Sequence, residues 1–340
     1  MTLSKQLRPR VVALGTAGGP KWWKSRAGVR RAGIATAVVV GEKFYLVDCG
    51  RGVGGQLSHA GLDLANMRGI FLTHLHSDHT VDLAGLAIFG LYEMLERTDD
   101  PVPIIGPGNR GMLPIASPRA AIPPTPLAPN SPTPGTREMF ELLMAAHATD
   151  LNDRIIDSLR PSPLELFNAS DIEIPGGIGY HPNDCPTPTM EPFDIYEDDL
   201  VTVSAILVEH PPIAPAFGFR FETEGGSVTF SGDTTYTPNM ATLARGTDLL
   251  FHEAIDFDWV EAVYANKADA ASRASRDHHY KSHTSVRDAA KLASEAGAGQ
   301  LALHHLVPGS APDATWQQDA DLFAGPFHVP NDLDSIRLRP

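Results

Sequence analysis

The sequence is poor in cysteine and has no long apolar run. Only two of its 340 residues are cysteines, Cys49 and Cys185, so we expect no disulfide framework and two thiols without a chemical role. No stretch of 18 apolar residues occurs, and we therefore expect no membrane-spanning helix. The segment that starts the chain contains no apolar run of the signal-peptide type, which predicts a cytoplasmic protein.

Basic residues are also in deficit. The chain has 27 Lys and Arg against 41 Asp and Glu, which gives a formal net charge of −14. Such a surface repels phosphate backbones at long range, and this argues against nucleic acid as the substrate. The hydrophobic share of 42% and the charged share of 20% are ordinary for a globular protein.

Composition changes sharply in the middle of the chain. Residues 101–134 contain eleven prolines, which excludes a regular helix or a central strand there. Residues 136–159 have helical spacing, and residues 160–195 are again rich in Pro, Gly and Asp. We therefore predict an insertion over residues 110–197, loop-like at both ends, which acts as a lid or a dimerisation element. Residues 1–109 and 198–340 then form the main domain.

The rest of the chain alternates short apolar strands with helices. Helical spacing is found in residues 52–65, 79–95 and 284–297. This alternation predicts an α/β protein with two packed sheets covered by helices. The predicted strands are Val11–Leu14, Ala35–Val40, Phe44–Val47, Gly69–Thr73, Leu200–Val208, Phe217–Glu222, Ser227–Phe230, Leu249–Phe251 and Gln300–Leu303.

Four metal-binding side chains follow one of these strands within six residues: His74, His76, Asp78 and His79. Imidazoles and a carboxylate are ligands that suit zinc. Protonated histidines so close together would repel one another, whereas a bound cation removes that cost. A surface histidine cluster is the simpler alternative, but a buried strand precedes this motif and an amphipathic helix follows it.

Three later strands each end in a further ligand type. His210 follows Ile206–Val208, Asp233 follows Val228–Phe230, and His305 follows Leu301–Leu303. Taken singly, each is more often a hydrogen-bonded or turn residue. Their occurrence in order after the six-residue motif favours a shared metal site.

This ordered set resembles the metallo-β-lactamase superfamily, and within it the tRNase Z and arylsulfatase-like branch. The resemblance runs from residue 11 to 308 and implies a four-layer αββα sandwich. The motifs that carry it are Leu14–Pro20, Asp48, His74–His79, His210 with Phe217–Arg220, Ser231–Thr234, His252–Ala254, Ser282–Thr284 and Leu303–His305.

The resemblance also implies a ligand assignment. His74, His76 and His210 would hold one ion, Asp78, His79 and His305 a second, and Asp233 would bridge them. His304 would be a non-ligand, a swap with His305 being the alternative. The expected cofactor is two Zn²⁺ ions, with Mn²⁺ or Fe²⁺ as the other options.

Further roles follow from the same resemblance. His283 would stabilise charge or protonate the leaving group, Glu253 would orient His283, and Asp78 is counted with them as catalytic. Asp48 would accept the spare N–H of a ligating histidine, or simply hold a loop.

Residues without a motif receive weaker assignments. Trp22 and Trp23 would wall a substrate pocket, unless they form a packed corner. His147, His181, His278 and His279 have no assigned role, so solvent exposure is expected for them.

We therefore predict a dinuclear zinc hydrolase that directs a metal-bridging hydroxide at a small-molecule ester: a carboxylic ester or lactone, a phosphodiester or a sulfate ester. Members of the tRNase Z family often carry a flexible arm between the third ligand and the bridging aspartate. Only 23 residues separate His210 from Asp233 here, so no arm fits. A tRNase Z-like endoribonuclease is the alternative. A hydrolytic dehalogenase, a mononuclear-metal oxygenase and a non-catalytic binding protein of this fold are the others. A homodimer without membrane contact is expected.

Overall fold

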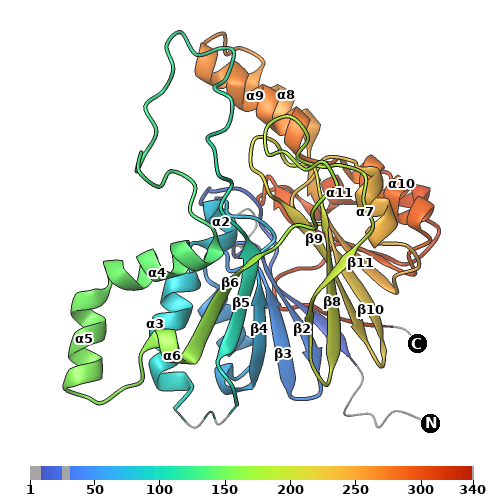
Figure 1. The fold of residues 1–340 in the computed structure, drawn as a ribbon. Helices are drawn as coiled ribbons and strands as arrows, with labels where there is room; N and C mark the ends of the chain where they lie inside the picture. Colours follow the sequence, from blue (N-terminus) through green and yellow to red (C-terminus); the bar gives the residue numbers. More distant parts are fainter. Residues whose placement is uncertain (1–8, 25–30, 96, 98, 339–340) are drawn as a thin grey trace.

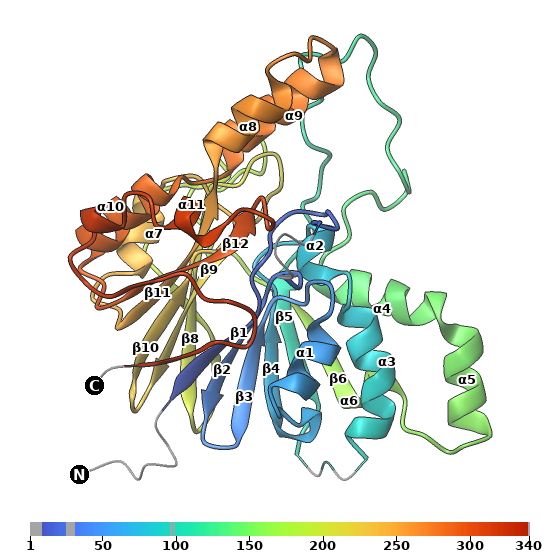
Figure 2. The ribbon, with the colours of Figure 1, turned by 180° about the vertical axis from the view of Figure 1, so that it is seen from behind.

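The computed structural model describes residues 9–24, 31–95, 97 and 99–338, and it consists of two seven-stranded sheets packed face to face (Figure 1). Helices cover the outer face of each sheet, as the two opposite views show (Figures 1 and 2). The predicted αββα sandwich is confirmed. Residues 1–8 of the segment assessed for a signal peptide lie outside the described part of the chain.

The first sheet has the order β14-β1-β2-β3-β4-β5-β6. The chain turns between β2 and β3 at Gly41, whose φ of 64° suits glycine, and this is the predicted hairpin. From β3 to β6 the strands are parallel. The strands are β1 (Arg10–Gly15), β2 (Ala35–Val40), β3 (Lys43–Val47), β4 (Met67–Phe71), β5 (Val102–Pro107), β6 (Phe167–Ile172) and β14 (Ser335–Arg337).

The second sheet has the order β13-β12-β11-β10-β9-β8-β7. Strands β10 to β13 are parallel, whereas β7, β8, β9 and β10 pair antiparallel. Its strands are β7 (Phe193–Glu197), β8 (Val201–Leu207), β9 (Phe217–Thr223), β10 (Gly226–Phe230), β11 (Leu249–Ile255), β12 (Leu301–Val307) and β13 (Phe327–His328).

Two groups of helices flank the sheets, α1, α3 and α4 beside the first and α7 and α10 beside the second (Figures 1 and 2). The helices are α1 (Val53–His59), α2 (Ser77–Thr80), α3 (Leu83–Glu93), α4 (Thr136–Ala146), α5 (Ala148–Ile156), α6 (Pro163–Leu166), α7 (Pro238–Leu243), α8 (Phe257–Tyr264), α9 (Ala270–Ser282), α10 (Val286–Ala296) and α11 (Asp313–Trp316). Short 3₁₀ turns occur at Leu64–Asn66 and Ala320–Leu322.

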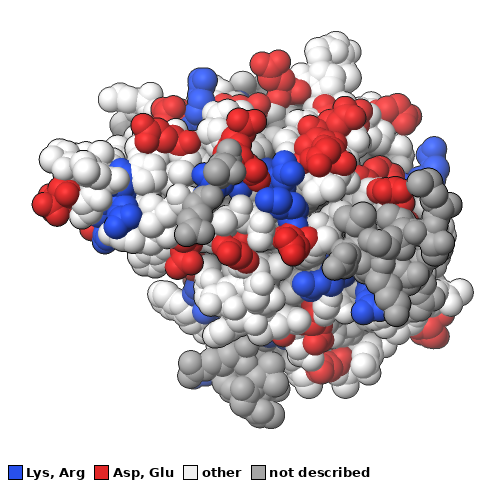
Figure 3. Space-filling view, turned by 90° about the horizontal axis from the view of Figure 1, so that it is seen from below, with Lys and Arg blue, Asp and Glu red and all other residues white. Residues whose placement is uncertain are grey.

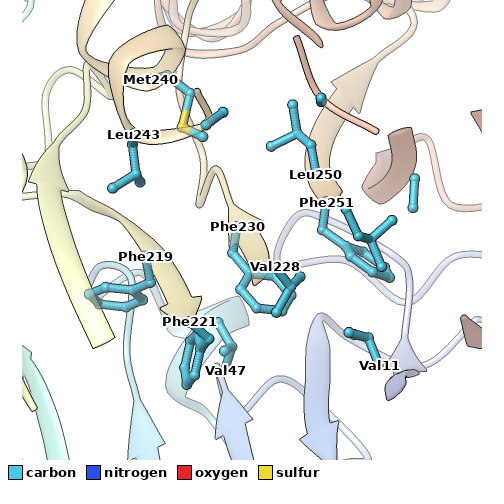
Figure 4. Packing of buried hydrophobic residues seen from close by; sticks show 14 of the residues in the cluster. Val11, Val47, Phe219, Phe221, Val228, Phe230, Met240, Leu243, Leu250 and Phe251 are labelled. Atoms are coloured by element: carbon cyan, nitrogen blue, oxygen red, sulfur yellow. The ribbon is translucent and has the colours of Figure 1, made fainter. Parts of the chain in front are cut away.

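The main core lies between the two sheets. Phe219, Phe221 and Phe230 of the second sheet face Val11 and Val47 of the first, as the close view shows (Figure 4). These side chains are almost fully buried, and each large apolar side chain removed from water contributes about 1.5–3 kcal/mol. The core therefore holds the two sheets at a fixed separation, so that loops from both sheets meet at one end.

The predicted helices are present, with breaks that the periodicity does not show. The stretch 79–95 divides into α2 and α3, and the stretch 136–159 divides into α4 and α5. Helix α10 ends at Gly297 in the left-handed region, as the glycine there predicts. The edge strands β6 and β7 and the helix pair α8–α9 are not predicted from the sequence.

The proline-rich stretch forms a long irregular loop over residues 108–135, most of it exposed. It arches away from β5 toward α9 and returns to α4 (Figure 1). The division of the chain at residues 110–197 into a separate insertion stays a prediction.

Two absences expected from the sequence concern the described residues. Cys49 is buried and Cys185 is half-buried, and both are free thiols. Within the described ranges, no helix is both long and apolar enough to cross a membrane.

Candidate metal centre

The six-residue motif lies at the end of the sandwich where loops of both sheets meet. Strand β4 runs into the motif, so His74 and His76 lie on the loop that leaves this strand. Asp78 and His79 lie in α2, a single turn. Because successive residues on a tight loop and turn point in different directions, the four side chains form two groups.

The first group is His74, His76 and His210. One ring nitrogen of each lies within 4.8 Å of the others. The His76 Nδ1 atom is 3.0 Å from His74 Nε2 and 3.2 Å from His210 Nε2. Burial lowers the pKa of His74 and His210 well below the ordinary value, and neutral imidazoles are the form that binds a metal.

The second group is Asp78, His79, Asp233 and His305, again with ligand atoms within 4.8 Å of one another. The His305 Nε2 atom lies 3.3 Å from Asp78 Oδ2 and 3.2 Å from Asp233 Oδ2. Burial opposes charge on His79, yet the carboxylates of Asp233, Asp48 and Asp78 raise its pKa well above the ordinary value. Without a cation this group therefore retains a proton, which a bound cation would displace.

Asp233 lies between the two groups. Its Oδ2 atom is 3.4 Å from His79 Nε2, 3.7 Å from His210 Nε2 and 3.9 Å from His74 Nε2. The structure thus brings all seven predicted ligands together from five separate segments of the chain.

The donor set fits divalent cations. The buried His79 Nε2 and Asp233 Oδ1 atoms have no hydrogen-bond partner, and a buried polar atom without a partner costs about 1–3 kcal/mol. Ring nitrogens facing one another at 3.0–3.2 Å are likewise unfavourable unless a proton or a cation lies between them. Nitrogen and carboxylate donors of this kind suit zinc and related metals.

Asp48 and Ser282 orient two of the histidines. Asp48 Oδ2 accepts a hydrogen bond from His79 Nδ1 at 2.8 Å, while its Oδ1 accepts one from the Thr73 backbone N–H at 2.8 Å. The Ser282 carbonyl accepts from His210 Nδ1 at 2.7 Å. Each contact leaves Nε2 of the histidine directed at the centre. The contact from Asp48 is the predicted one, whereas Ser282 is not predicted.

The glycine-rich loop after β1 closes the centre from the other side. The Gly19 N–H donates to Asp78 Oδ2 at 2.9 Å. A Cβ atom on Gly18 would lie 2.4 Å from the Nδ1 atom of His305, so only glycine fits there. His305 itself has φ of 47°, a backbone conformation that a non-glycine residue adopts only when its surroundings enforce it.

His283 and Glu253 form a buried pair beside the first group. The His283 Nδ1 atom lies 3.0 Å from both carboxylate oxygens of Glu253. Burial opposes the charged imidazole, but Glu253 outweighs it and raises the pKa of His283 to about 9. Glu253 also accepts from the Thr234 backbone N–H at 2.7 Å, which holds the carboxylate in place.

A cavity of about 500 Å³ opens onto the centre. Its walls include His283 and, from α9, His278 and His279. The expectation of solvent exposure is wrong for His278 and His279, because both are half-buried against the site. Nothing in the local sequence distinguishes them, since the folding of α9 over the cavity decides their place. His147 is exposed as expected, and His181 pairs with Asp184 at 3.0 Å.

The remaining predicted residues divide between the site and the core. Trp22 is 82% exposed beside a smaller hollow that also reaches Asp78. Trp23 forms a packed corner, because its Nε1 donates to the Gly18 carbonyl at 2.8 Å and its ring meets Trp259 edge-on. The His304 ring is buried against Phe230 and Phe251, away from the ligands.

Comparison with known proteins gives related sequences over most of the chain. The family model described as "Beta-lactamase superfamily domain" matches residues 164–306, and the model for "Anti-Pycsar protein Apyc1" matches residues 35–104. Ribonuclease Z of Mycobacterium bovis (strain BCG / Pasteur 1173P2) is 31% identical over 316 residues, which are 91% of this chain and 93% of the relative. Ribonuclease Z of Mycobacterium sp. (strain KMS) is 31% identical over 318 residues, 92% of each chain.

Solved structures share the fold. The short form of human tRNase Z has a TM-score of 0.60 and 19% identity, with 97% of this chain and 100% of that chain covered. The metallo-β-lactamase fold protein YhfI of Bacillus subtilis has a TM-score of 0.57 and 16% identity, with 97% and 99% covered.

These relatives correct two predictions. A small-molecule ester substrate, with nucleic acid argued against, is wrong, because the relatives that align over nearly the whole chain are named ribonuclease Z. The physical reason for the error is that net charge averages over the whole surface, whereas a substrate meets only the charges around one cavity. The missing arm was also a weak argument, since other segments can stand over the site.

The divalent-metal donor set, the two-sheet sandwich and the sequence identity agree with one another. The chain therefore belongs to the ribonuclease Z branch of the metallo-β-lactamase superfamily and is a metal-dependent hydrolase.

Proposed function

We propose that this protein is an endoribonuclease that hydrolyses a phosphodiester bond of RNA. The observation that carries the proposal is the 31% identity to ribonuclease Z over 91% of the chain. The geometry supports it, because seven ligand side chains and a buried histidine–carboxylate pair surround one cavity. A cavity of about 500 Å³ can admit one nucleotide of a strand.

We assign the ligands as the two groups of side chains suggest. His74, His76 and His210 would hold one ion, and Asp78, His79 and His305 the other, with Asp233 shared between them. Two Zn²⁺ ions suit these donors best, with Mn²⁺ or Fe²⁺ as the alternatives. Such ions supply activation of water and neutralisation of charge on the phosphate.

The chain's own residues perform the remaining tasks. His283, which Glu253 keeps protonated, would donate its Nε2 proton to the ribose oxygen that leaves as the P–O bond breaks. Asp78 accepts the Gly19 N–H and so holds the glycine-rich loop against the centre. Asp48 fixes the ring of His79 through Nδ1. These contacts keep the site in place before substrate binds.

The test is cleavage of RNA by the purified, zinc-loaded protein. We expect cleavage of a labelled tRNA precursor with a 3′ extension, or of a single-stranded oligoribonucleotide, at defined positions. A panel of carboxylic and sulfate esters serves as the comparison. The proposal fails if the protein binds metal but leaves every RNA intact.

Two variants separate the roles of the residues. His76→Ala should lose metal, seen by elemental analysis, and all RNA cleavage. His283→Ala should keep its metal and lose rate by about 10²–10⁴-fold, the usual contribution of general acid catalysis. His147→Ala, at an exposed histidine, is the matched control and should change neither quantity. Full activity of His76→Ala would contradict the ligand assignment.

The homodimer and the cytoplasmic location stay predictions. Sedimentation of the purified protein measures the first, and fractionation of cells measures the second. The loop of residues 108–135 is a natural place to look for a dimer contact, because Ile115, Ile122 and Leu127 on it are more than 70% exposed.

A further inference from the structure

The helix pair α8–α9 projects beyond the sandwich at the end that carries the metal centre, as both ribbon views show (Figures 1 and 2). We propose that this helical hairpin, residues 257–282, is an arm that binds the RNA strand leading to the cleavage site. The inference rests on the proposed function and names the surface that holds the substrate. It would take the place of the arm for which no room exists between His210 and Asp233.

The hairpin is part of the wall of the catalytic cavity. Ser275, His278 and His279 of α9 line the cavity, and so does Tyr264 at the end of α8. Helix α9 then ends at Ser282, whose carbonyl holds His210, and the next residue is His283. A strand with its phosphate at the centre would therefore meet α9 as soon as it leaves the cavity.

Unpaired cations extend along the hairpin from its tip to its base. Lys267 lies between the two helices, Arg273 lies in the first turns of α9, and Lys281 lies in its last turn. All three side chains are exposed, and none forms an ion pair with a carboxylate of the described residues. The 13 residues of α9 span about 20 Å at 1.5 Å per residue, a length that covers several phosphates of one strand.

The acidic groups of the hairpin are largely neutralised. Glu261 is 2.5 Å from Arg276, and Asp277 is 2.6 Å from Arg119 of the proline-rich loop. These contacts leave the three unpaired cations to dominate the local field. At the opposite end of the molecule, by contrast, acidic and basic side chains are interspersed (Figure 3).

The contact between Arg119 and Asp277 also joins the loop of residues 108–135 to the hairpin. The loop rises from β5 and meets α9 far from the sandwich (Figure 1). The two segments thus form a frame above the cavity. A single strand can approach through such a frame, whereas the cations along one side attract its phosphates.

Binding of labelled RNA to metal-free protein in EDTA tests the arm without cleavage. The arm variant is Lys267→Glu with Arg273→Glu and Lys281→Glu. The control variant is Arg160→Glu with Arg245→Glu and Lys291→Glu, which changes the net charge equally at positions outside the hairpin and the cavity wall. Circular dichroism melting shows whether both variants remain folded.

We expect the arm variant to bind the tRNA precursor about tenfold or more weakly in fluorescence anisotropy. Its slope of log Kd against log salt should fall by about 2, because about three phosphate contacts are lost. The control should stay within about twofold of the wild type. Equal loss in both variants, unchanged binding by the arm variant, or no binding by the wild type at low salt would each overturn the inference.

A second measurement separates this inference from the proposed function. Zinc-loaded wild type and arm variant should hydrolyse bis(p-nitrophenyl) phosphate equally, since this small ester does not reach the arm. If the wild type binds RNA through the hairpin but cleaves none, the proposed function fails and the arm stands. If RNA is cleaved by both proteins with the same KM, the arm fails and the proposed function stands.

Discussion

Replacing Glu253 by Gln isolates the electrostatic role of one carboxylate. Both carboxylate oxygens lie 3.0 Å from His283 Nδ1, and both residues are buried. Glutamine keeps the size of the side chain and an oxygen that can accept the hydrogen bond. It removes only the negative charge.

The size of the effect follows from the pKa of His283. Burial lowers this pKa, and Glu253 contributes most to raising it to about 9 from an ordinary value of 6.5. At 1.36 kcal/mol per pKa unit, this rise corresponds to about 3 kcal/mol in favour of the charged imidazole. Without the carboxylate, burial prevails, and we expect the titration midpoint to fall by about 2 pH units or more.

NMR of the histidine rings in metal-free protein measures the midpoint directly. In the zinc-loaded enzyme the same change should appear in the pH profile of RNA cleavage. His283 donates a proton, so activity is present below its pKa and is lost above it. A lower pKa therefore moves the alkaline loss of kcat to lower pH. The exposed Glu224→Gln is the matched control. An alkaline limb at the same pH in Glu253→Gln and wild type would refute the assignment of His283 as the acid.

Three further predictions concern the centre and its supports. Asp233→Asn should lose both metals together in elemental analysis, because Asp233 lies between the two groups; loss of only one would show that it is not shared. Gly18→Ala should reduce metal content and cleavage, since the added Cβ would lie 2.4 Å from the His305 ring, while Gly54→Ala, with nothing within 4 Å, should change neither. Asp332→Ala should lower the free energy of unfolding in urea by about 2–4 kcal/mol, because this carboxylate accepts hydrogen bonds from Thr16 N, Thr16 Oγ1 and Ala32 N. The exposed Asp321→Ala should cost less than about 0.5 kcal/mol, and equal losses would contradict the structural role of Asp332.

The charge of the chain misled the prediction of its substrate for a reason that the hairpin makes concrete. A net charge of −14 counts Glu261 and Asp277 in full. In the folded protein each of them pairs with an arginine, whereas Lys267, Arg273 and Lys281 do not. Electrostatic attraction acts through the local field, so the sum over the sequence carried little information about the substrate.

The sequence by itself determined the sandwich and the ligand candidates. Apolar strands that end in His, Asp or His–Asp motifs are a local signal, because a strand's side-chain pattern and its terminal residue are both read from neighbouring positions. The αββα sandwich and the residues from His74 to His305 could therefore be predicted without coordinates. The contact between Asp48 and a ligating histidine could be predicted from the resemblance.

Only the tertiary structure decided which residues surround these ligands. Helix α9 carries His278 and His279, and nothing in its local sequence places them beside the cavity. Ser282 holds His210 through a backbone carbonyl, which every residue possesses and which no motif reveals. Edge strands β6 and β7 form because they find partners in the sheets, since pairing depends on a neighbour distant in sequence. Contacts of this kind join residues separated by long stretches of chain, and local patterns therefore cannot encode them.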